Sequence, residues 1–512
     1  MSRSKGSPAD GSPAPASSAE GAGAGGAGAE ARGAGGSTAE GRQVRAAETG
    51  GGGAGGGGAG EAGGGGAGAG RAGDRGARVG RGAVWCNWAG NQTARPRRIA
   101  VPGSAEEVAD EVRRAAEEGV TVKAVGSGHS FTAAAVTEGV LIRPDRLRQV
   151  HGIDRAAGTV TVGSGLPLSE LNRLLAAAGL ALTNMGDIMA QTVAGAVGTG
   201  THGTGRDSGS IAAQVRGVEL VLADGSVAHC TPEQNPELFQ GARLGLGALG
   251  VVTALTFGVE PAFLLTAHEQ PLRFDEVLDR FEEFTTENEH FEFYWFPHTD
   301  RCSTKRNNRS GGPAAPLPRF SAWLEDEFLS NTVWDAACRV GRRFPGVIPS
   351  LAQISSRAWS ERTYTDTSYK VFTSPRRVRF VEMEYAVPRE AAVEVLRAVR
   401  ERVERSDWRI SFPVEVRVAP ADDVWLSTAH GRDTCYIAVH LFRGTDEPGY
   451  FAEIERIMTA HQGRPHWGKL HTRDAAYLAE AYPRFADFAA LRDRVDPERR
   501  FGNAYLRTVL GS

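Results

Sequence analysis

The pattern of apolar and polar positions after residue 100 predicts a protein of mixed α and β structure. Val108, Val112 and Ala115 recur at the spacing of one helical face and predict a helix of about 15 residues. Ser104 precedes this face and Glu107 stands three residues later, the arrangement of a capping box. Short apolar runs typical of strands follow, and we expect strands at 120–125, 139–143, 149–153 and 159–162 and a helix from Pro167.

The second half of the chain continues this α+β pattern with more aromatic residues. The composition changes after Glu260, and we place a domain boundary there. We expect further strands at 215–222, 251–259, 379–386, 415–418 and 434–442, with helices at 236–241 and 389–405.

The first 80 residues have a different composition from the rest. They hold 29 of the 66 glycines of the chain and almost no large apolar side chains. Such a segment cannot bury enough apolar surface to offset the conformational entropy lost on folding. We therefore predict a disordered Gly/Ala-rich tail over 1–80, which is either a natural extension or the product of an over-extended reading frame.

Charge, cysteine content and hydropathy narrow the function classes. A net charge of -3 lacks the basic excess of a nucleic-acid binder. Five cysteines without a CxxC pair indicate neither a disulfide framework nor a thiolate metal site. The uncharged stretch from Leu244 to Val259 is shorter than the roughly 18 to 20 residues of a membrane span, and no secretory signal follows Met1. We expect a cytoplasmic protein with no integral membrane span.

One glycine motif imitates a dinucleotide-binding site. Residues 245–250, GLGALG, fit the GxGxxG fingerprint. That fingerprint requires a strand before the glycines and a helix after them, because the helix N-terminus faces the pyrophosphate. The predicted helix lies before these glycines and the predicted strand after them, so we exclude a Rossmann NAD site.

Two other glycine-rich segments follow strands or stand between them. GSGHS at 126–130 comes directly after an apolar run, where bare backbone amides can approach an anion. Alone it is also what an ordinary glycine turn contains. The second block, from Asn184 to Ser210, includes TGTHGTG at 199–205 and lacks side chains large enough to pack a core. We expect a flat polar ligand to fill that space.

With these motifs, residues 84–508 resemble the aldonolactone oxidoreductases, which include L-gulonolactone and D-arabinono-1,4-lactone oxidases and have alditol oxidase as a close relative. The family belongs to the flavoproteins with a vanillyl-alcohol oxidase-type (PCMH-type) FAD-binding fold. The order of the motifs carries the resemblance: GSGHS at 126–130, TVTVGSG at 159–165, TGTHGTG at 199–205, MEY at 383–385, EVR at 415–417, HWGK at 466–469 and FGNAYL at 501–506.

The resemblance implies an α+β fold and a bound FAD. The implied domains are an FAD-binding domain at 84–260, an α+β substrate or cap domain at 261–465 and a C-terminal segment at 466–512 that returns to the flavin. In many members the histidine matching His129 is bonded covalently to the flavin 8α-methyl group; the alternative is a loop histidine that only hydrogen-bonds. The cofactor-binding positions implied are Val125, Gly126, Ser127, Gly128, His129, Ser130, Phe131, Thr199, Thr204, Ser210 and Val252.

Glu415 and Arg417 alternate by two on a predicted strand, so both side chains point to the same face. From spacing alone they form a solvated ion pair, which contributes little to stability. The resemblance instead places a Glu-x-Arg pair over the flavin, where it binds substrate hydroxyls. A guanidinium can form two hydrogen bonds to such a ligand.

Lys469 and His440 complete the implied catalytic set. Lys469 alone has the plain interpretation of a surface lysine, whereas the resemblance aims it at flavin and substrate, where a cation stabilises developing negative charge. His440 matches a pocket histidine of alditol oxidase only approximately, and a core histidine is the alternative. His466 and His471 lack the spacing and third ligand of a zinc site, so we expect no metal.

The resemblance implies FAD-dependent oxidation of a sugar 1,4-lactone at C2. Hydride would pass to flavin N5, and the electrons would pass to oxygen or another acceptor, which could be a redox partner protein. An alternative is a polyol (alditol) oxidase, and a third is a flavin-binding protein without catalysis. Glu415, Arg417 and Lys469 together argue against the third.

Overall fold

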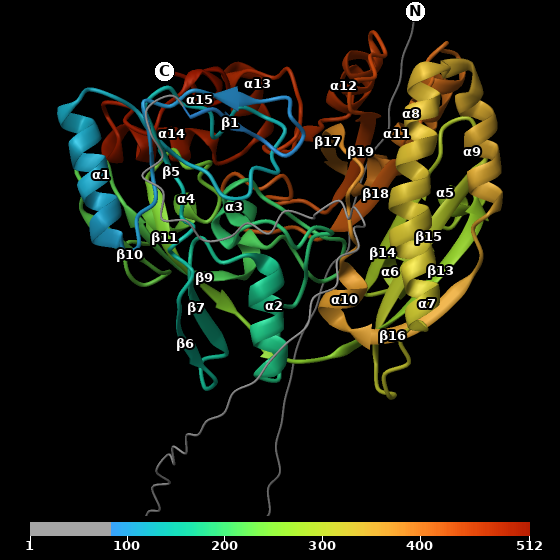
Figure 1. The fold of residues 1–512 in the computed structure, drawn as a ribbon, viewed down its shortest axis with the longest axis horizontal. Helices are drawn as coiled ribbons and strands as arrows, with labels where there is room; N and C mark the ends of the chain where they lie inside the picture. The colour runs from blue at the N-terminus through green and yellow to red at the C-terminus, as the bar shows by residue number, and fades with distance from the viewer. Residues whose placement is uncertain (1–82) are drawn as a thin grey trace, which may run out of the picture. The chain divides into compact units, whose positions relative to one another are not determined.

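The computed structural model describes residues 83–512, so the predicted tail at 1–80 lies outside the described residues. Two lobes, each built on its own sheets, stand side by side (Figure 1). We call residues 83–258 the N-terminal lobe and residues 264–465 the central lobe. The chain leaves the last strand of the first lobe at Gly258 and enters the first strand of the second at Leu264.

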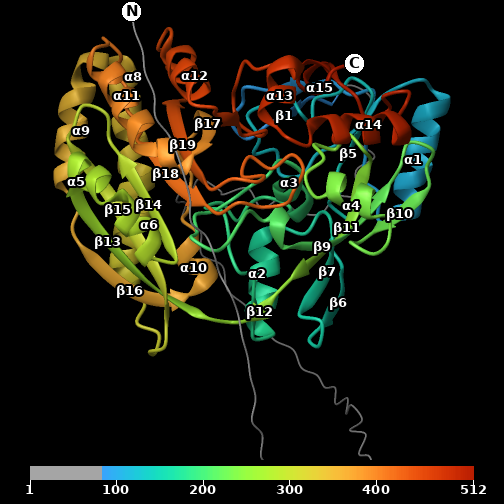
Figure 2. The ribbon, with the colours of Figure 1, turned by 180° about the vertical axis from the view of Figure 1, so that it is seen from behind.

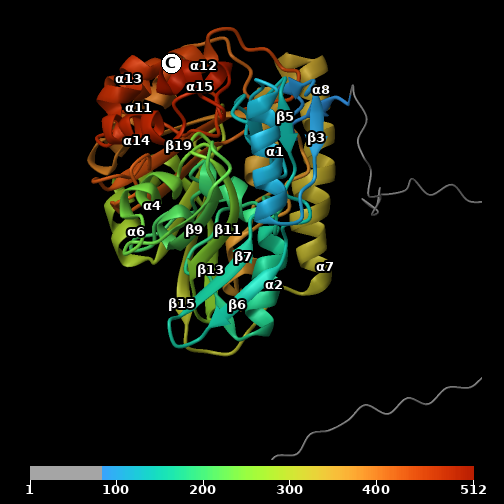
Figure 3. The same ribbon diagram turned by 90° about the vertical axis from the view of Figure 1, so that its left-hand side faces the viewer.

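The N-terminal lobe contains a small parallel sheet and a larger antiparallel one. In the parallel sheet, β5 lies between β3 and β4, and helix α1 packs beside it (Figure 3). The antiparallel sheet has the order β10-β9-β11-β7-β6. The bounds are β3 Arg98–Ala100, β4 Val122–Ala124, β5 Val140–Ile142, β6 Val150–Asp154, β7 Thr159–Gly163, β9 Val215–Val221, β10 Val227–Cys230, β11 Val251–Gly258 and α1 Ala105–Glu117.

The central lobe is built on one sheet of eight strands in the order β16-β13-β15-β14-β18-β19-β17-β20, with every neighbouring pair antiparallel. The bounds are β13 Leu264–Arg273, β14 His290–Trp295, β15 Arg301–Ser310, β16 Arg362–Thr367, β17 Phe380–Pro388, β18 Val414–Ala419, β19 Thr434–Phe442 and β20 Arg464–Pro465.

The two faces of this sheet differ because side chains alternate along each strand. One set of alternate positions is apolar and packs with helices α11 and α12 into a core that includes Phe293, Val416 and Ile437. The other set is rich in Glu, Arg, His and Tyr. Antiparallel sheets commonly bury one face this way, but here the second face is buried as well, and it holds the candidate site.

Helices and short strands complete both lobes. They are β1 Trp85–Cys86, β2 Thr93–Ala94, β8 Leu180–Ala181, β12 Glu260–Pro261, α2 Leu168–Ala177, α3 Val193–Gly198, η1 Ala212–Gln214, α4 Pro236–Ala242, α5 Phe274–Asp279, α6 Phe281–Glu287, α7 Arg319–Ala322, η2 Trp323–Val333, α8 Trp334–Arg343, η3 Pro345–Val347, α9 Ile348–Arg357, α10 Ser368–Phe372, η4 Arg389–Ala391, α11 Ala392–Glu404, α12 Tyr450–Ala460, α13 Ala475–Ala481, α14 Phe485–Val495 and α15 Ala504–Leu510. In residues 83–512 no helix is both long and apolar enough to cross a bilayer.

The C-terminal helices α13, α14 and α15 lie over the N-terminal lobe (Figure 2). Phe485 and Phe488 belong to the same core as α4 of that lobe, and Phe501 packs with α1. The backbone of Val122 donates a hydrogen bond to the carbonyl of Arg500 at 2.8 Å. The end of the chain is therefore built into the first lobe.

Most elements expected from the sequence are confirmed, and two local expectations are corrected. Ser104 Oγ accepts from the Glu107 amide at 3.2 Å, but the Glu107 carboxylate accepts from Gly103 N at 2.7 Å, one residue away from a true capping box. The glycine-rich block contains helix α3, and its Val193, Ala196 and Val197 are buried in the core. The expectation that this block cannot pack a core was wrong, because three small apolar side chains on one helix contribute to the core of the N-terminal lobe.

The order of elements around GLGALG is confirmed as helix before and strand after: α4 ends at Ala242 and β11 begins at Val251. Its backbone serves a structural purpose. Lys123, buried on β4, donates to the carbonyls of Leu246, Gly247 and Phe501 at 3.3, 3.1 and 3.2 Å. One buried amino group, whose pKa burial lowers to about 7, thus joins this loop and the C-terminal segment to the parallel sheet.

We predict that Lys123→Met lowers the free energy of unfolding by about 2 to 4 kcal/mol, because three carbonyls lose their donor in a buried place. Urea unfolding measures the change. Lys370→Met, at an exposed lysine paired with Asp366, should change stability by about 0.5 kcal/mol or less. Equal losses in the two variants would contradict the role given to Lys123.

Candidate active site

The polar face of the central sheet forms a buried layer of charged side chains. Cross-strand partners share a face, and the register places Tyr294, Glu415, Ala438 and Glu384 in one row across β14, β18, β19 and β17. A second row on the same face holds Glu292, Arg417 and Tyr436. A third row, on the opposite flank of the first row but on the same face, holds His440 and Glu382. The alternation expected for Glu415 and Arg417 is therefore present, and neighbouring strands extend it.

Arg417 sits between two carboxylates. Its Nε donates to Glu292 Oε2 at 2.8 Å, and its Nη2 pairs with Glu415. The three side chains are only 10%, 7% and 12% exposed. The interpretation of Glu415 and Arg417 as a solvated ion pair is wrong, because both groups have left water and depend on each other for charge balance.

A loop of each lobe meets this cluster. Asp187 of the N-terminal lobe accepts from Arg376 Nε at 2.7 Å and from Ser374 Oγ at 3.0 Å, both on the central-lobe segment after α10. Arg376 Nη2 also donates to the Tyr294 hydroxyl at 3.3 Å. Burial alone would raise the pKa of Asp187, but Arg376 and Arg417 lower it, so its carboxylate stays charged.

Glu415 has the opposite balance. Burial raises its pKa above the ordinary value, and the lowering effect of Arg417 does not offset this, with Asp187 adding a further rise. The Tyr294 hydroxyl donates to Glu415 Oε1 at 3.3 Å. Glu415 therefore binds a proton more readily than Asp187 does.

Lys469 lies between the two glutamates of β17. Its Nζ pairs with Glu382 Oε2 and stands 3.9 Å from Glu384 Oε2. Burial would lower the pKa of Lys469, but these two carboxylates raise it, so the ammonium form is favoured. Burial would raise the pKa of Glu382, yet Lys469 and His440 lower it to about 2. The plain interpretation of Lys469 as a surface lysine is wrong.

His440 lies beside Glu382, and His202 lies beside Glu384. His440 Nδ1 donates to the carbonyl of Pro413 at 3.0 Å, and its Nε2 lies 3.5 Å from Glu382 Oε1. His202 Nδ1 donates to the carbonyl of Gly203 at 3.0 Å, and its Nε2 lies 3.2 Å from Glu384 Oε1. Since a carbonyl can only accept, Nδ1 of each ring carries the proton of that hydrogen bond, and the Nε2 atom lies beside a carboxylate.

The HWGK segment places Lys469 at the boundary between the lobes, because it is hydrogen-bonded to both. On one side, His466 N donates to Glu384 O at 3.0 Å, which extends the β17 ladder. On the other, the amide of Phe131 donates to Gly468 O at 2.8 Å, and Thr132 Oγ1 donates to Trp467 O at 3.1 Å. The segment thereby places Lys469 next to the GSGHS turn.

One histidine cluster needs separate comment. His202, Glu384 and His466 bring potential metal-ligand atoms within 4.8 Å of one another, a group that the sequence comparison of His466 with His471 did not find. Both ring nitrogens of His466 are already engaged, with Gly200 O at 3.1 Å and Gly468 N at 3.0 Å. We therefore assign the cluster a structural role in holding the HWGK segment.

His129 occupies the boundary between the lobes. Its ring stacks on Trp88 with centroids 5.4 Å apart and an interplanar angle of 28°. Burial lowers the pKa of His129 to about 4, and the positive Lys469 contributes. Its Nδ1 is buried and has no hydrogen-bond partner in residues 83–512. The imidazole is therefore neutral at pH 7 with one nitrogen unused.

The other expected cofactor positions divide into two groups. Val125, Gly126, Ser127, Gly128, Ser130 and Phe131 surround His129 in one turn, and the Phe131 ring lies 5.4 Å from Lys469 Nζ. The hydroxyls of the second group form hydrogen bonds inside the fold. Thr199 Oγ1 donates to Gly195 O at 3.0 Å, Thr204 Oγ1 donates to Phe291 O, and Ser210 Oγ accepts from Ala213 N at 3.3 Å. Val252 is half-buried on β11.

The residues present fit an FAD. A bound group is one explanation for buried polar atoms that lack partners. Within the described part of the chain, the N-terminal lobe has five such atoms: Arg98 Nη2, His129 Nδ1, Ser164 Oγ, Gln191 Oε1 and Arg243 Nε. Three of them, on His129, Ser164 and Gln191, belong to the glycine-rich segments. Ser164 belongs to the TVGSG stretch singled out in the sequence. The GSGHS turn, with Gly128 at φ +70, would hold the flavin end beside Lys469.

Several site residues escaped sequence reasoning. Glu292 and Tyr294 alternate on β14, as do Glu382 and Glu384 on β17, so the period that identified Glu415 and Arg417 was available for them. Asp187 and Arg376 offer no such signal, because each sits in a loop and the pair is joined only by the fold.

Two family comparisons cover most of the described chain. Residues 255–509 match the family described as D-arabinono-1,4-lactone oxidase. Residues 96–231 match the family described as FAD binding domain. The two matches fall on the central lobe with the C-terminal segment and on the N-terminal lobe, respectively.

Individual relatives match over nearly their whole length. The chain is 44% identical to L-gulono-1,4-lactone dehydrogenase of Mycobacterium tuberculosis over 84% of this chain and 99% of that protein. It is 33% identical to L-gulonolactone oxidase of Bos taurus over 84% and 98%, and 36% identical to alditol oxidase of a Streptomyces species over 83% and 98%.

Among solved structures, cholesterol oxidase from Brevibacterium sterolicum superposes with a TM-score of 0.71, covering 83% of this chain and 96% of that chain. At 18% identity this likeness shows a shared fold alone.

We predict that Arg417→Met lowers the free energy of unfolding by about 3 to 5 kcal/mol, because Glu292 and Glu415 are left as unpaired buried charges. Unpaired buried carboxyls have raised pKa values in the folded state, so the loss should be smaller at pH 5 than at pH 8. Urea unfolding at the two pH values measures both effects.

The matched control is the triple variant Arg417→Met, Glu292→Gln, Glu415→Gln, which removes the stranded charges and should recover most of the lost stability. A single variant as stable as the parent chain at pH 8 would show that the cluster is not a buried ion-pair network.

Proposed function

The chain belongs to the aldonolactone oxidoreductase family, and from that premise we propose that it oxidises carbon 2 of a sugar 1,4-lactone of the L-gulono or D-arabinono type. The proposal rests on the buried charged layer: Glu415 and Arg417 pair within it, and Lys469, which lies near Glu415, joins it to the turn that holds His129. Loss of two electrons and two protons from the C2 alcohol gives a ketone, which can rearrange to an ene-diol.

A second candidate is oxidation of a linear polyol. The Streptomyces relative at 36% identity is named alditol oxidase, and charged groups that bind lactone hydroxyls can bind polyol hydroxyls as well. Competition between L-gulono-1,4-lactone and xylitol for reduction of a dye acceptor separates the two. The proposal expects the lactone to be the preferred substrate, and preference for xylitol would contradict it.

The charge of each side chain determines its proposed role in binding and oxidising the substrate. Arg417 is held between two carboxylates and presents fixed donors to substrate oxygens. Glu415, whose pKa burial raises, is suited to accept the hydroxyl proton. Lys469 keeps its positive charge through Glu382 and Glu384 and stabilises negative charge that develops beside it. His440 supports this arrangement through Glu382.

FAD, when bound, supplies the two-electron redox chemistry. We propose that it is attached covalently through His129. The support is a neutral imidazole, since its pKa lies near 4, with a buried Nδ1 that lacks any partner in the described chain. Trp88 fixes the plane of the ring from one side. Val125, Gly126, Ser127, Gly128, Ser130 and Phe131 would hold the same end of the cofactor.

We also propose a reducing compartment, the cytoplasm, as the place of action. All five cysteines, within residues 83–512, are free thiols, and four of them are buried. Such a set suits a compartment in which disulfides do not persist. Fractionation of cells that produce the protein tests this, and recovery from an oxidising compartment would contradict it.

We predict that the flavin of the parent protein stays with the acid-precipitated chain, whereas His129→Ala releases all flavin that it binds. Absorbance of pellet and supernatant measures the distribution. His229→Ala, at an exposed histidine, should behave like the parent. Complete release from the parent protein would refute the covalent bond.

We predict that Glu382→Gln shifts the basic limb of the kcat profile to lower pH by about 1 to 3 units. The physical reason is that Glu382 raises the pKa of Lys469, so a neutral amide lets the lysine lose its proton earlier. Measurement of kcat against pH at saturating lactone checks this.

Glu394→Gln, at an exposed glutamate of α11, serves as the matched control and should leave the profile in place. A basic limb that does not move in Glu382→Gln would mean that Lys469 is not the group whose deprotonation ends activity.

A further inference from the structure

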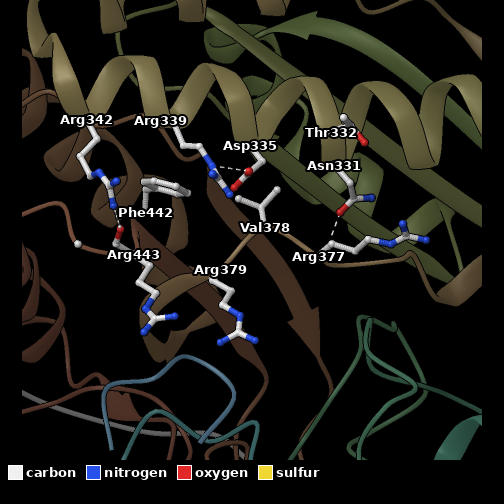
Figure 4. Close-up of a pocket in the computed structure, with 11 residues that line it drawn as sticks. Asn331, Thr332, Asp335, Arg339, Arg342, Arg377, Val378, Arg379, Phe442 and Arg443 are labelled. Atoms are coloured by element: carbon white, nitrogen blue, oxygen red, sulfur yellow. Dashed lines mark hydrogen bonds and ion pairs between the residues drawn. The ribbon is translucent and has the colours of Figure 1, made fainter. Parts of the chain in front are cut away.

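A cavity of about 610 Å³ opens beside the end of β17 and β19, outside the charged layer described above. Its charged lining consists of Arg339, Arg342, Arg377, Arg379, Arg443 and Asp335. Five positive side chains thus face one negative side chain. Figure 4 shows that α8 lies along one side of this cavity and the ends of two strands along another.

Two of these arginines are neutralised and three are not. Arg339 pairs with Asp335 at 2.7 Å, and Arg377 pairs with Glu327 at 2.7 Å. Within residues 83–512, no carboxylate lies within 4.0 Å of a side-chain nitrogen of Arg342, Arg379 or Arg443. All three side chains are exposed, so water screens their mutual repulsion, and an anion between them would accept charge-assisted hydrogen bonds from guanidinium groups that no carboxylate occupies.

The backbone holds these three groups together. Phe380 and Phe442 form the last pair of the β17–β19 ladder, so Arg379 and Arg443 extend from adjacent strands just beyond it. The Arg443 amide donates to Arg379 O at 3.0 Å, and Arg342 Nη1 donates to Arg443 O at 3.2 Å. Figure 4 shows Arg379 and Arg443 running in the same direction from this point.

A series of contacting rings leads from the cavity to His129. Phe442 lines the cavity and stacks on Phe412 with centroids 6.4 Å apart. Phe412 meets Phe380 at 5.4 Å, Phe380 meets Trp88 at 5.4 Å, and Trp88 stacks on His129 at 5.4 Å. The cavity is thereby joined to the residue proposed to carry the flavin.

The Arg443 guanidinium also touches the loop that holds Trp88. A Cβ at Gly90 would stand 2.5 Å from Arg443 Nη2, so the positive end of the side chain lies directly against this loop. A negative ligand on Arg443 would therefore sit close to the first ring that contacts His129.

We propose that this cavity, which we call the arginine pocket, binds a small anionic electron acceptor, an inference that rests on the proposed function. Its volume suits a small molecule, and its unpaired guanidinium groups select negative charge. The balance is simple for a one-electron acceptor such as hexacyanoferrate(III). One lactone loses two electrons and two protons, two hexacyanoferrate(III) ions become hexacyanoferrate(II), and both protons pass to solvent.

Binding is tested without turnover by calorimetry of the flavin-loaded protein with hexacyanocobaltate(III). This ion has the charge and shape of hexacyanoferrate(III) but does not accept electrons. The parent protein should bind it, and Arg379→Glu with Arg443→Glu should bind it at least about tenfold more weakly, because two attractive charges become repulsive. Arg173→Glu, at an exposed arginine of α2, is the matched control and should bind like the parent. Equal binding by all three proteins would overturn the proposal.

Kinetics then separate the pocket from the catalytic site. In the double variant, KM for hexacyanoferrate(III) should rise about tenfold or more, while KM for the ferrocenium cation stays the same or falls. Lactone turnover with ferrocenium should be kept in the double variant, and its absence in the parent protein would instead contradict the proposed function. If KM rises to the same extent for both acceptors, or if hexacyanocobaltate(III) does not compete with hexacyanoferrate(III), the arginine pocket is not the acceptor site.

Discussion

A charge taken out of water needs a partner of opposite sign, and this constraint organises the whole boundary between the lobes. The central sheet presents Glu292, Glu382, Glu384 and Glu415 on its polar face. Arg417 pairs with Glu292 and Glu415, and Lys469 lies between Glu382 and Glu384, so each cation serves two carboxylates and its removal would leave them without it. The same pairing that stabilises the fold therefore fixes the positions of the groups that would meet a substrate.

The partners of these charges come from distant parts of the chain, so the network also holds the lobes together. Lys469 arrives on a segment hydrogen-bonded to β17 on one side and to Phe131 on the other. Asp187 of the N-terminal lobe pairs with Arg376 of the central lobe. A deformation that separates the lobes would break ion pairs in a site of low dielectric, where each is worth most. The ion pairs that hold the two lobes together therefore also fix the geometry of the candidate site.

Sequence patterns predicted the parts of the site that depend on local periodicity. The spacing of Glu415 and Arg417 placed both on one strand face, and the order of motifs brought His129 and Lys469 into one site. The patterns could not find Asp187 or Arg376, because no periodicity marks a loop residue whose partner lies about 190 positions away. Burial was equally invisible: Lys469 and the Glu415–Arg417 pair have the composition of surface groups, and only the fold removes them from water.

We infer that the buried charges of the sheet form the substrate site and keep their pairing when substrate binds. A crystal structure of the flavin-loaded protein with L-gulono-1,4-lactone, collected without an electron acceptor, tests it most directly. We expect lactone oxygens within hydrogen-bond distance of Glu415 and Lys469, with the pairs of Arg417 to Glu292 and of Lys469 to Glu382 intact. A lactone bound elsewhere, or bound only after those pairs have broken, would contradict it.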